Sequence, residues 1–145
     1  MSKMDMKRDY YHLIINGERT ESSSGETIEA VNPATGQLIA KVAKGTKEDA
    51  EKAVLAAREA FDHGKWRKAS VNKRSRVLNK IGAIMRSRFN ELVELEVLNS
   101  GKTLSTAQGQ VMQAIEDFEF YAGAIVGHGG SVNNIAGQFH NYTEK

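Results

Sequence analysis

Histidine is the side chain most often used to bind a metal or to move a proton near neutral pH, and this chain has four histidines. A zinc site commonly takes pairs of ligands only a few residues apart. The four histidines lack this spacing and have no cluster of Asp or Glu beside them: His12, His63, His128 and His140. Their pattern does not predict a metal site.

Two other groups have residue types that occur in active sites. Glu116, Asp117 and Glu119 are close together in the sequence, as an acid and a base can be, but a solvated helix face explains the same spacing. Residues 128–131, His-Gly-Gly-Ser, have the composition of a phosphate loop without the glycine spacing of the dinucleotide or P-loop motifs. We interpret them as a turn. The residues alone assemble no nucleophile, base and oxyanion donors.

The composition excludes further chemistry. The chain has 145 residues and no cysteine, which rules out disulfides, thiolate metal ligands and a cysteine nucleophile within it. A net charge of +2 is too small to indicate a polyanionic partner. No apolar run approaches the ~20 residues of a membrane span, and the charged first ten residues lack the apolar core of a secretion signal. These features predict a soluble, cytoplasmic protein.

Helical periodicity organises the middle of the chain. Apolar residues recur every three or four positions across residues 70–101, which predicts one helix of about eight turns with Ser70 as its N-cap. Gly101 is expected to end this helix, because glycine tolerates the left-handed conformation that closes the last turn. Thr46 and Asp49 have the spacing of a capping box and predict an earlier helix. A third helix is expected from about residue 104 to residue 126. The face of the earlier helix that we expect to be buried carries Ala50, Ala53, Val54, Ala57 and Phe61.

Short β-rich segments occupy the first 45 residues. Strands are predicted at 11–15, 27–31 and 38–42, and Asn16-Gly17 predicts a tight hairpin turn. The fold class is therefore α+β, with N-terminal antiparallel strands, three helices and a C-terminal strand near residues 139–144. Residues 1–10 are expected to be frayed. The chain ends inside the last predicted strand, which indicates a fragment or a truncated product.

The basic residues between Lys65 and Arg88 are the one feature that could indicate a nucleic-acid surface. They are interleaved with the apolar stripe of the long helix, and only Trp66 and Phe89 lie among them for stacking. We interpret them as a solvated helix face and expect no nucleic-acid partner and no membrane. The nucleic-acid alternative predicts binding that depends steeply on salt.

Several short stretches between about Tyr11 and Lys145 form a collinear set. They are Leu-Ile-Ile-Asn-Gly-Glu at 13–18, Val-Asn-Pro-Ala-Thr-Gly at 31–36, the alanine-rich helix at 53–61, Trp66-Arg67 with Arg74, Leu95-Glu96, Asn-Ser-Gly-Lys at 99–102, residues 118–123, and Phe-His-Asn-Tyr-Thr at 139–143. In this order and at this spacing, the set resembles the N-terminal part of the aldehyde dehydrogenase superfamily.

The resemblance implies an α/β aldehyde dehydrogenase-like fold in the intact family. Residues 11–127 would be the N-terminal part of its dinucleotide-binding domain, and 128–145 the start of its oligomerisation β arm. The implied reaction is NAD(P)-dependent oxidation of an aldehyde to a carboxylic acid. A cysteine thiolate attacks the carbonyl, hydride passes to the nicotinamide, and a glutamate-activated water releases the acid.

The family's cysteine, glutamate, oxyanion-hole asparagine and cofactor loops would all lie beyond Lys145. We therefore expect no catalytic and no cofactor-binding residue here, no NAD or NADP bound by this chain alone, and no turnover by it. The expected partners are further copies, joined through the C-terminal strand as a homo-oligomer, or the remainder of a dehydrogenase. The alternative is a stand-alone structural or oligomerisation module derived from the family.

One local site can be carried over from the resemblance. Some members hold a monovalent cation with backbone oxygens just before the Asn-Pro-Ala-Thr-Gly turn and with an aspartate just before the Gly-Lys pair. Here the backbone oxygens would be those of Ala30 and Val31, and the place of the aspartate is taken by Asn99. A neutral amide lacks the charge that strengthens such a site.

Overall fold

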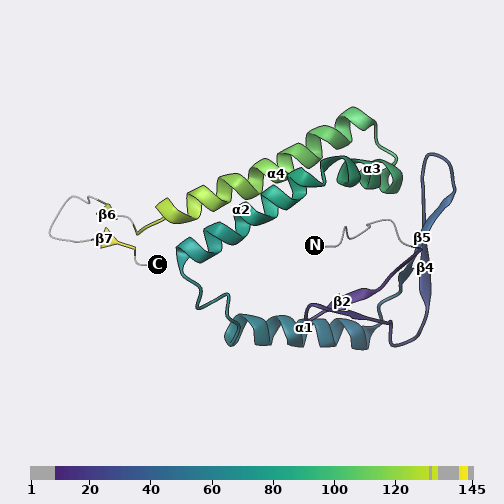
Figure 1. The fold of residues 1–145 in the computed structure, drawn as a ribbon. Coiled ribbons are helices and arrows are strands. Elements are labelled where there is room, and N and C mark those ends of the chain that lie inside the picture. Colours follow the sequence, from purple (N-terminus) through teal and green to yellow (C-terminus); the bar gives the residue numbers. More distant parts are fainter. Residues whose placement is uncertain (1–8, 131, 134–140, 144–145) are drawn as a thin grey trace.

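The computed structural model describes residues 9–130, 132–133 and 141–143. Strands and one helix form the lower part of the molecule in Figure 1, and three helices form a layer above them. The strands of the lower part are β1 (Tyr10–Tyr11), β2 (Leu13–Ile15), β3 (Glu18–Thr20), β4 (Thr27–Val31) and β5 (Leu38–Ala43), followed by the helix α1 (Lys47–Asp62). The helical layer is α2 (Val71–Ser87), α3 (Phe89–Ser100) and α4 (Leu104–Gly127).

The first strands confirm the predicted turn and correct the predicted pairing. β2 and β3 form an antiparallel hairpin in which Ile15 pairs with Glu18, so Asn16 and Gly17 make a two-residue turn, with positive φ angles of 53° and 79°. The strand predicted at 11–15 is divided at His12, because its two halves pair with different partners. β1 lies parallel to β5 in the sheet order β1-β5-β4, so the arrangement is not wholly antiparallel.

The prediction of a single helix over residues 70–101 is wrong, because this stretch forms two helices that meet at Arg88. This residue has φ −113° and ψ 21°, outside the helical range, between α2 and α3. Its N–H still donates to the carbonyls of Ile84 and Met85 at the end of α2, and its carbonyl accepts the N–H of Leu92 in the first turn of α3. The bend allows both α2 and α3 to pack on α4 (Figure 1). The predicted caps, Ser70 at the start and a left-handed Gly101 at the end, are confirmed.

The hydrophobic core lies where α3 meets α4. Its buried members are Val93, Ala107, Val111 and Ile115, and partly buried apolar residues around them come from α2 and α3. Gly82 brings α2 close to α4, since a Cβ added there would lie only 3.2 Å from the Glu119 Cγ. Arg86 then donates two hydrogen bonds to Glu119, at 2.9 and 3.0 Å. The third predicted helix is confirmed as α4.

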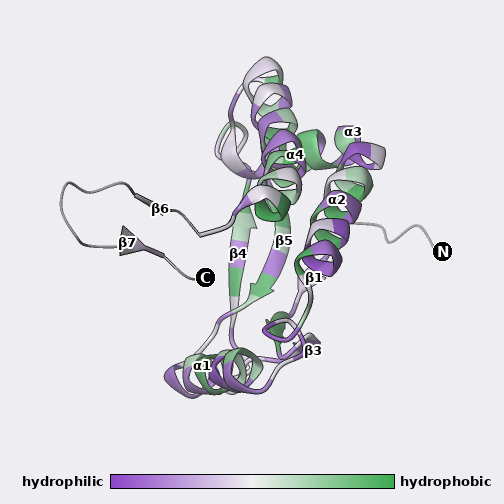
Figure 2. Cartoon of the chain, turned by 90° about the vertical axis from the view of Figure 1, so that its left-hand side faces the viewer, coloured by the Kyte–Doolittle hydropathy of each residue, from purple (hydrophilic) through white to green (hydrophobic). Residues whose placement is uncertain are grey.

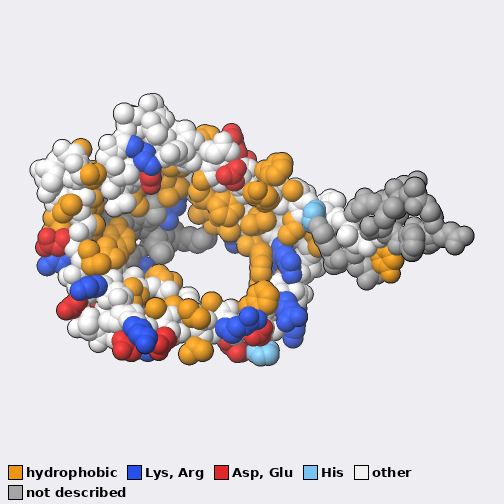
Figure 3. All heavy atoms as spheres, turned by 180° about the vertical axis from the view of Figure 1, so that it is seen from behind, with side chains coloured by type: hydrophobic (Ala, Val, Ile, Leu, Met, Phe, Trp, Pro, Cys, Tyr) orange, Lys and Arg blue, Asp and Glu red, His pale blue; other side chains and the backbone are white. Residues whose placement is uncertain are grey.

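The prediction that the apolar face of α1 is buried is wrong for this chain. Hydrophobic and hydrophilic residues alternate along α1, as in an amphipathic helix (Figure 2). Yet Val54 is 67% exposed and Phe61 is 64% exposed, and Asp49 is the one buried residue of the helix. Figure 3 shows an opening through the molecule with hydrophobic side chains along its rim. The face is exposed because no described element covers it.

Two short strands follow α4. β6 (Val132–Asn133) pairs antiparallel with β7 (Asn141–Tyr142), joining Val132 to Tyr142. β7 is the described part of the predicted C-terminal strand; Phe139 and His140 lie outside the described residues. Among the helices that the structure describes, none combines the length and apolar character needed to cross a bilayer.

Candidate functional site

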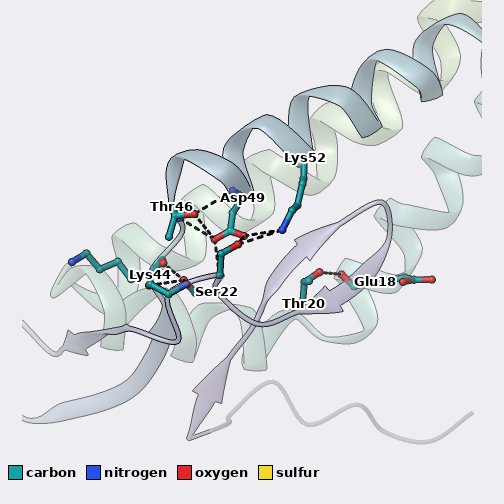
Figure 4. A network of polar contacts seen from close by, with 9 residues as sticks. Glu18, Thr20, Ser22, Lys44, Thr46, Asp49 and Lys52 are labelled. Carbon is teal, nitrogen blue, oxygen red and sulfur yellow. Dashed lines mark hydrogen bonds and ion pairs between the residues drawn. The ribbon is translucent and has the colours of Figure 1, made fainter.

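A cluster of polar side chains joins the start of α1 to the serine-rich loop of residues 22–25 (Figure 4). The Asp49 carboxylate is at its centre and only 3% of the residue is exposed. Its Oδ2 accepts hydrogen bonds from the Ser23 N–H at 3.0 Å, the Thr46 N–H at 3.0 Å and the Thr46 hydroxyl at 3.1 Å. Its Oδ1 accepts the Ser23 hydroxyl. The Asp49 N–H donates to Thr46 Oγ1 at 3.3 Å, which confirms the predicted capping box.

These donors stabilise the ionised carboxylate. The hydrogen bond from the Ser23 side chain, followed by those from the Thr46 and Ser23 backbone N–H groups, holds the pKa of Asp49 well below its usual range, and burial opposes this only in part. The Lys52 ammonium lies 3.9 Å from Asp49 Oδ1 and donates to Ser23 Oγ at 3.3 Å. The sequence predicts the cap but not the contact with Ser23, because the loop and the helix meet only in the fold.

Ser23, Asp49 and Lys52 have the residue types of a nucleophile with its base, but the geometry argues against that role. A carboxylate with a strongly lowered pKa is a weak base. The Lys52 ammonium donates to Ser23 Oγ, so it is not placed to remove the hydroxyl proton. We interpret this group as a structural clamp, the Asp49 clamp, which fixes α1 to the loop of residues 22–25.

The carboxylates of α4 do not gather into an acid–base pair. Glu119 binds Arg86 of α2, whereas Asp117 accepts a hydrogen bond from Gln113 of its own helix at 3.0 Å. Glu116 is exposed. This arrangement agrees with the interpretation of a helix face.

The histidines that the structure describes also remain apart. His12 Nδ1 lies 3.0 Å from Glu21, while His63 and His128 are the C-terminal caps of α1 and α4. His140 lies outside the described residues. Within the described ranges, no three His, Cys, Asp or Glu side chains come together as metal ligands.

The residues predicted to hold a monovalent cation come from two elements that the fold brings together. Ala30 and Val31 end β4, where the pairing with β5 shifts register between them. Asn99 lies in the last turn of α3 and is exposed. The turn after β4 contacts the end of α3 closely, since a Cβ added at Gly101 would lie 2.7 Å from the Pro33 Cγ. The donor set would be two carbonyls and an amide, and the cation site stays a prediction.

A cleft of about 310 Å³ lies beside this junction, between the β4–β5 turn and α3. Leu95 and Leu98 of α3 form one wall. The facing residues are Asp9, Tyr11, Asn32, Gln37, Leu38 and Ile39. The cleft is not predictable from the sequence pattern, because it joins side chains of α3 to residues near the β4–β5 turn that are more than fifty positions away.

Comparison with known proteins shows which family this chain resembles in sequence. The sequence model described as "Aldehyde dehydrogenase family" matches residues 20–145. Aldehyde dehydrogenase 1 of Tanacetum cinerariifolium is 38% identical over 90% of this chain and 26% of its own length. Malonate-semialdehyde dehydrogenase of Bacillus pumilus is 40% identical over 86% of this chain and 25% of its own.

A solved structure agrees with these relatives. The NAD-dependent aldehyde dehydrogenase from Sinorhizobium meliloti superposes with a TM-score of 0.82 and 30% identity, over 90% of this chain and 26% of that one. The α+β arrangement described here is thus a partial piece of a dehydrogenase fold. The chain belongs to the aldehyde dehydrogenase family. It spans about a quarter of the length of the relatives that it matches.

Proposed function

We propose that this chain is the N-terminal segment of an NAD(P)-dependent aldehyde dehydrogenase, which oxidises an aldehyde to a carboxylic acid, and that the segment does not catalyse this reaction alone. The observation that carries the proposal is the absence of cysteine from all 145 residues of a chain in this family. The reaction begins with attack by a cysteine thiolate on the carbonyl. The nucleophile must therefore come from another part of the protein.

The cofactor is also expected to bind to the remainder of the protein, outside this segment. NAD or NADP accepts hydride in the intact protein. Two cavities of the described chain, of about 310 and 360 Å³, are each lined by leucine side chains and by one carboxylate, Asp9 or Glu94. A carboxylate beside a pyrophosphate is electrostatically unfavourable. The cavities therefore do not suit a dinucleotide, which supports the assignment.

The exposed apolar side chains indicate what this segment contributes. Monomeric soluble proteins rarely leave large apolar patches uncovered. Several helices of this chain nevertheless expose large apolar side chains, and Figure 3 shows hydrophobic side chains around the opening. In the intact enzyme, the sheet of the dinucleotide-binding domain would pack against these faces. The large apolar residues that are exposed on the helices and would be covered in this way include Val54, Leu55, Phe61, Val77, Ile84, Leu104 and Val126.

We expect the purified chain to produce no NADH or NADPH when it is supplied with either oxidised cofactor and a panel of short aldehydes. A full-length aldehyde dehydrogenase assayed in parallel is the positive control. Reduced cofactor formed by the pure chain would contradict the proposal. The native protein, detected in its source cells through this N-terminal sequence, should have an intact mass several times 16.0 kDa. A species of 16.0 kDa would favour the second candidate function instead.

That second candidate is a stand-alone association module, and the exposed apolar faces also favour it. The chain would join its own copies or full-length subunits, through these faces and through the C-terminal strand as the beginning of a β arm. It predicts one defined oligomer by light scattering, whereas a molten or polydisperse sample would contradict it.

The cation site yields a separate prediction. Replacing Asn99 with Asp adds a carboxylate to the carbonyls of Ala30 and Val31, so the Asn99→Asp variant should be stabilised by KCl more than the parent chain is. Thermal unfolding in KCl and in choline chloride at equal ionic strength measures the difference. Asn90→Asp, at another exposed asparagine of α3, is the matched control. Equal potassium effects on both variants would argue against a site at Asn99.

A further inference from the structure

The small net charge of this chain hides a strong separation of charge along it. Residues 63–90 contain nine Lys or Arg and no Asp or Glu. Residues 91–127 contain six Asp or Glu and a single Lys. Within the part of the chain that the structure describes, the salt bridges of this cationic segment lie at its end, where Arg86 binds Glu119 and Arg88 binds Glu91. The remaining cations of α2 need another explanation.

Three of these cations form one row on α2, which we call the basic stripe: Lys73, Arg76 and Lys80. They follow one another at steps of three and four residues, so they are neighbours on the helix surface. All three are exposed. Gly82, which marks the contact with α4, lies about 120–180° around the helix axis from each of them, at 3.6 residues per turn. The basic stripe therefore faces away from α4 and from its carboxylates.

The basic stripe is unfavourable for an isolated helix. Like charges three or four residues apart repel each other. Lys73 also lies in the first turn of α2, where the helix dipole favours anions, and that turn has no acidic residue. Local charge arrangements that cost stability are commonly found where a partner compensates for them. The expected partner is an anionic surface.

An exposed anionic surface lies on α4, and we call it the acidic–aromatic patch: Glu116, Asp117, Phe120 and Tyr121. Glu116 and Phe120, like Asp117 and Tyr121, are four residues apart and so share a helix face. Phe120 is 68% exposed and Tyr121 is 61% exposed, with their rings in edge-to-face contact at 5.3 Å. Aromatic residues are enriched at the centre of protein–protein interfaces, and charged residues lie mainly at the rim, so the two rings would form the centre of a contact and the two carboxylates its edge.

We propose that the basic stripe of one chain binds the acidic–aromatic patch of a second copy of the same chain. The two surfaces cannot meet within one molecule, because the basic stripe faces away from the helix that carries the patch. Between copies, each chain supplies both signs of charge, so one pair of molecules can make two equivalent contacts. This contact is separate from the C-terminal strand and does not depend on dehydrogenase activity.

Sedimentation velocity of the full chain at low and high salt tests the proposal. The Debye length falls from ~30 Å at about 10 mM salt to ~3 Å at about 1 M. We expect the dissociation constant of the dimer to rise at least about tenfold over this range, as for contacts steered by charge. The triple variant K73E/R76E/K80E and the double variant E116K/D117K should each be monomeric at low salt.

A mixture of the two variants provides the decisive comparison. Every charge of the contact is reversed in the mixture, so the two variants should associate with each other although neither self-associates. Reversing Lys41 and Lys47, two exposed cations outside the basic stripe, should leave the association of the parent chain unchanged. Circular dichroism checks folding, and glutamates near the start of α2 should preserve its helicity.

Three results would overturn the proposal. The parent chain could be monomeric at both salt concentrations. Its association could persist or strengthen in high salt, which would assign it to the apolar faces, since screening weakens charge contacts but not apolar ones. The mixed variants could also fail to associate while both remain folded.

Discussion

Truncating Ile115 to alanine is expected to lower the free energy of unfolding of the helical layer by about 2–5 kcal/mol. Ile115 is fully buried, with 0% exposure, and lies with Val93, Ala107 and Val111 at the junction of α3 and α4. Losing most of this side chain removes apolar burial and leaves a cavity that rigid helices fill only in part. Because this core has few members, a loss of that size is a large share of the total stability of a small domain.

Urea unfolding followed by circular dichroism measures this loss as a shift of the midpoint at an unchanged slope. The matched control is Val54→Ala, which truncates a side chain that is 67% exposed on α1. In this chain alone, the control should change stability by no more than about 0.5 kcal/mol. Equal losses for Ile115→Ala and Val54→Ala would contradict the core described here.

The same control tests the proposed function. If the face of α1 is covered by the remainder of a dehydrogenase, Val54→Ala should become clearly destabilising when it is made in the complete enzyme. A negligible effect there as well would mean that this face stays exposed in the assembled protein.

The features that the sequence predicted correctly are those decided within a few residues. Asn16-Gly17 makes the hairpin turn because these two residues tolerate positive φ. Thr46 and Asp49 form their capping box because both partners lie within one helical turn. Gly101 ends α3 in a left-handed conformation. Each of these depends on backbone geometry that neighbouring residues determine.

The features that it missed depend on distant contacts. No Gly or Pro lies between Gly82 and Gly101 to mark the bend at Arg88, which lets both α2 and α3 pack on α4. The parallel pairing of β1 with β5 joins residues about thirty positions apart. The face of α1 follows a valid helical period, but periodicity shows which side is apolar and not whether anything covers it. Ser23 joins the Asp49 clamp across 26 residues of sequence.

Replacing Asp49 with Asn is expected to loosen α1 from the loop of residues 22–25 and to remove part of the acid sensitivity of the chain. An amide of the same shape loses the charge that strengthens the hydrogen bonds from Ser23 and Thr46, and its NH₂ group faces their donors. Thr46→Ala removes the reciprocal half of the cap and should cost about 1 kcal/mol. Asp49→Asn should be the more damaging of the two.

The pH dependence follows from the direction of the pKa shift. The pKa of Asp49 is lower in the folded chain than in the unfolded chain, where it is about 3.9. The folded state therefore gains stability from the ionised carboxylate above that value, and loses it as the pH falls through about 4 toward the lower folded pKa. Glu26, whose pKa is lowered by its hydrogen bond with Lys44, adds a smaller loss in the same direction.

Thermal unfolding of the parent chain and of Asp49→Asn, measured from neutral pH down to about pH 3, separates these contributions. The melting temperatures of the two proteins should differ most at neutral pH and converge in acid. In the parent, protonation of Asp49 removes the carboxylate charge only at low pH, whereas the substitution removes this charge at every pH. The slope that remains in the variant reports Glu26 and the other carboxylates. Glu59→Gln, at an exposed residue of α1, should follow the parent. A constant difference between parent and Asp49→Asn across this range would show that the Asp49 clamp does not depend on charge.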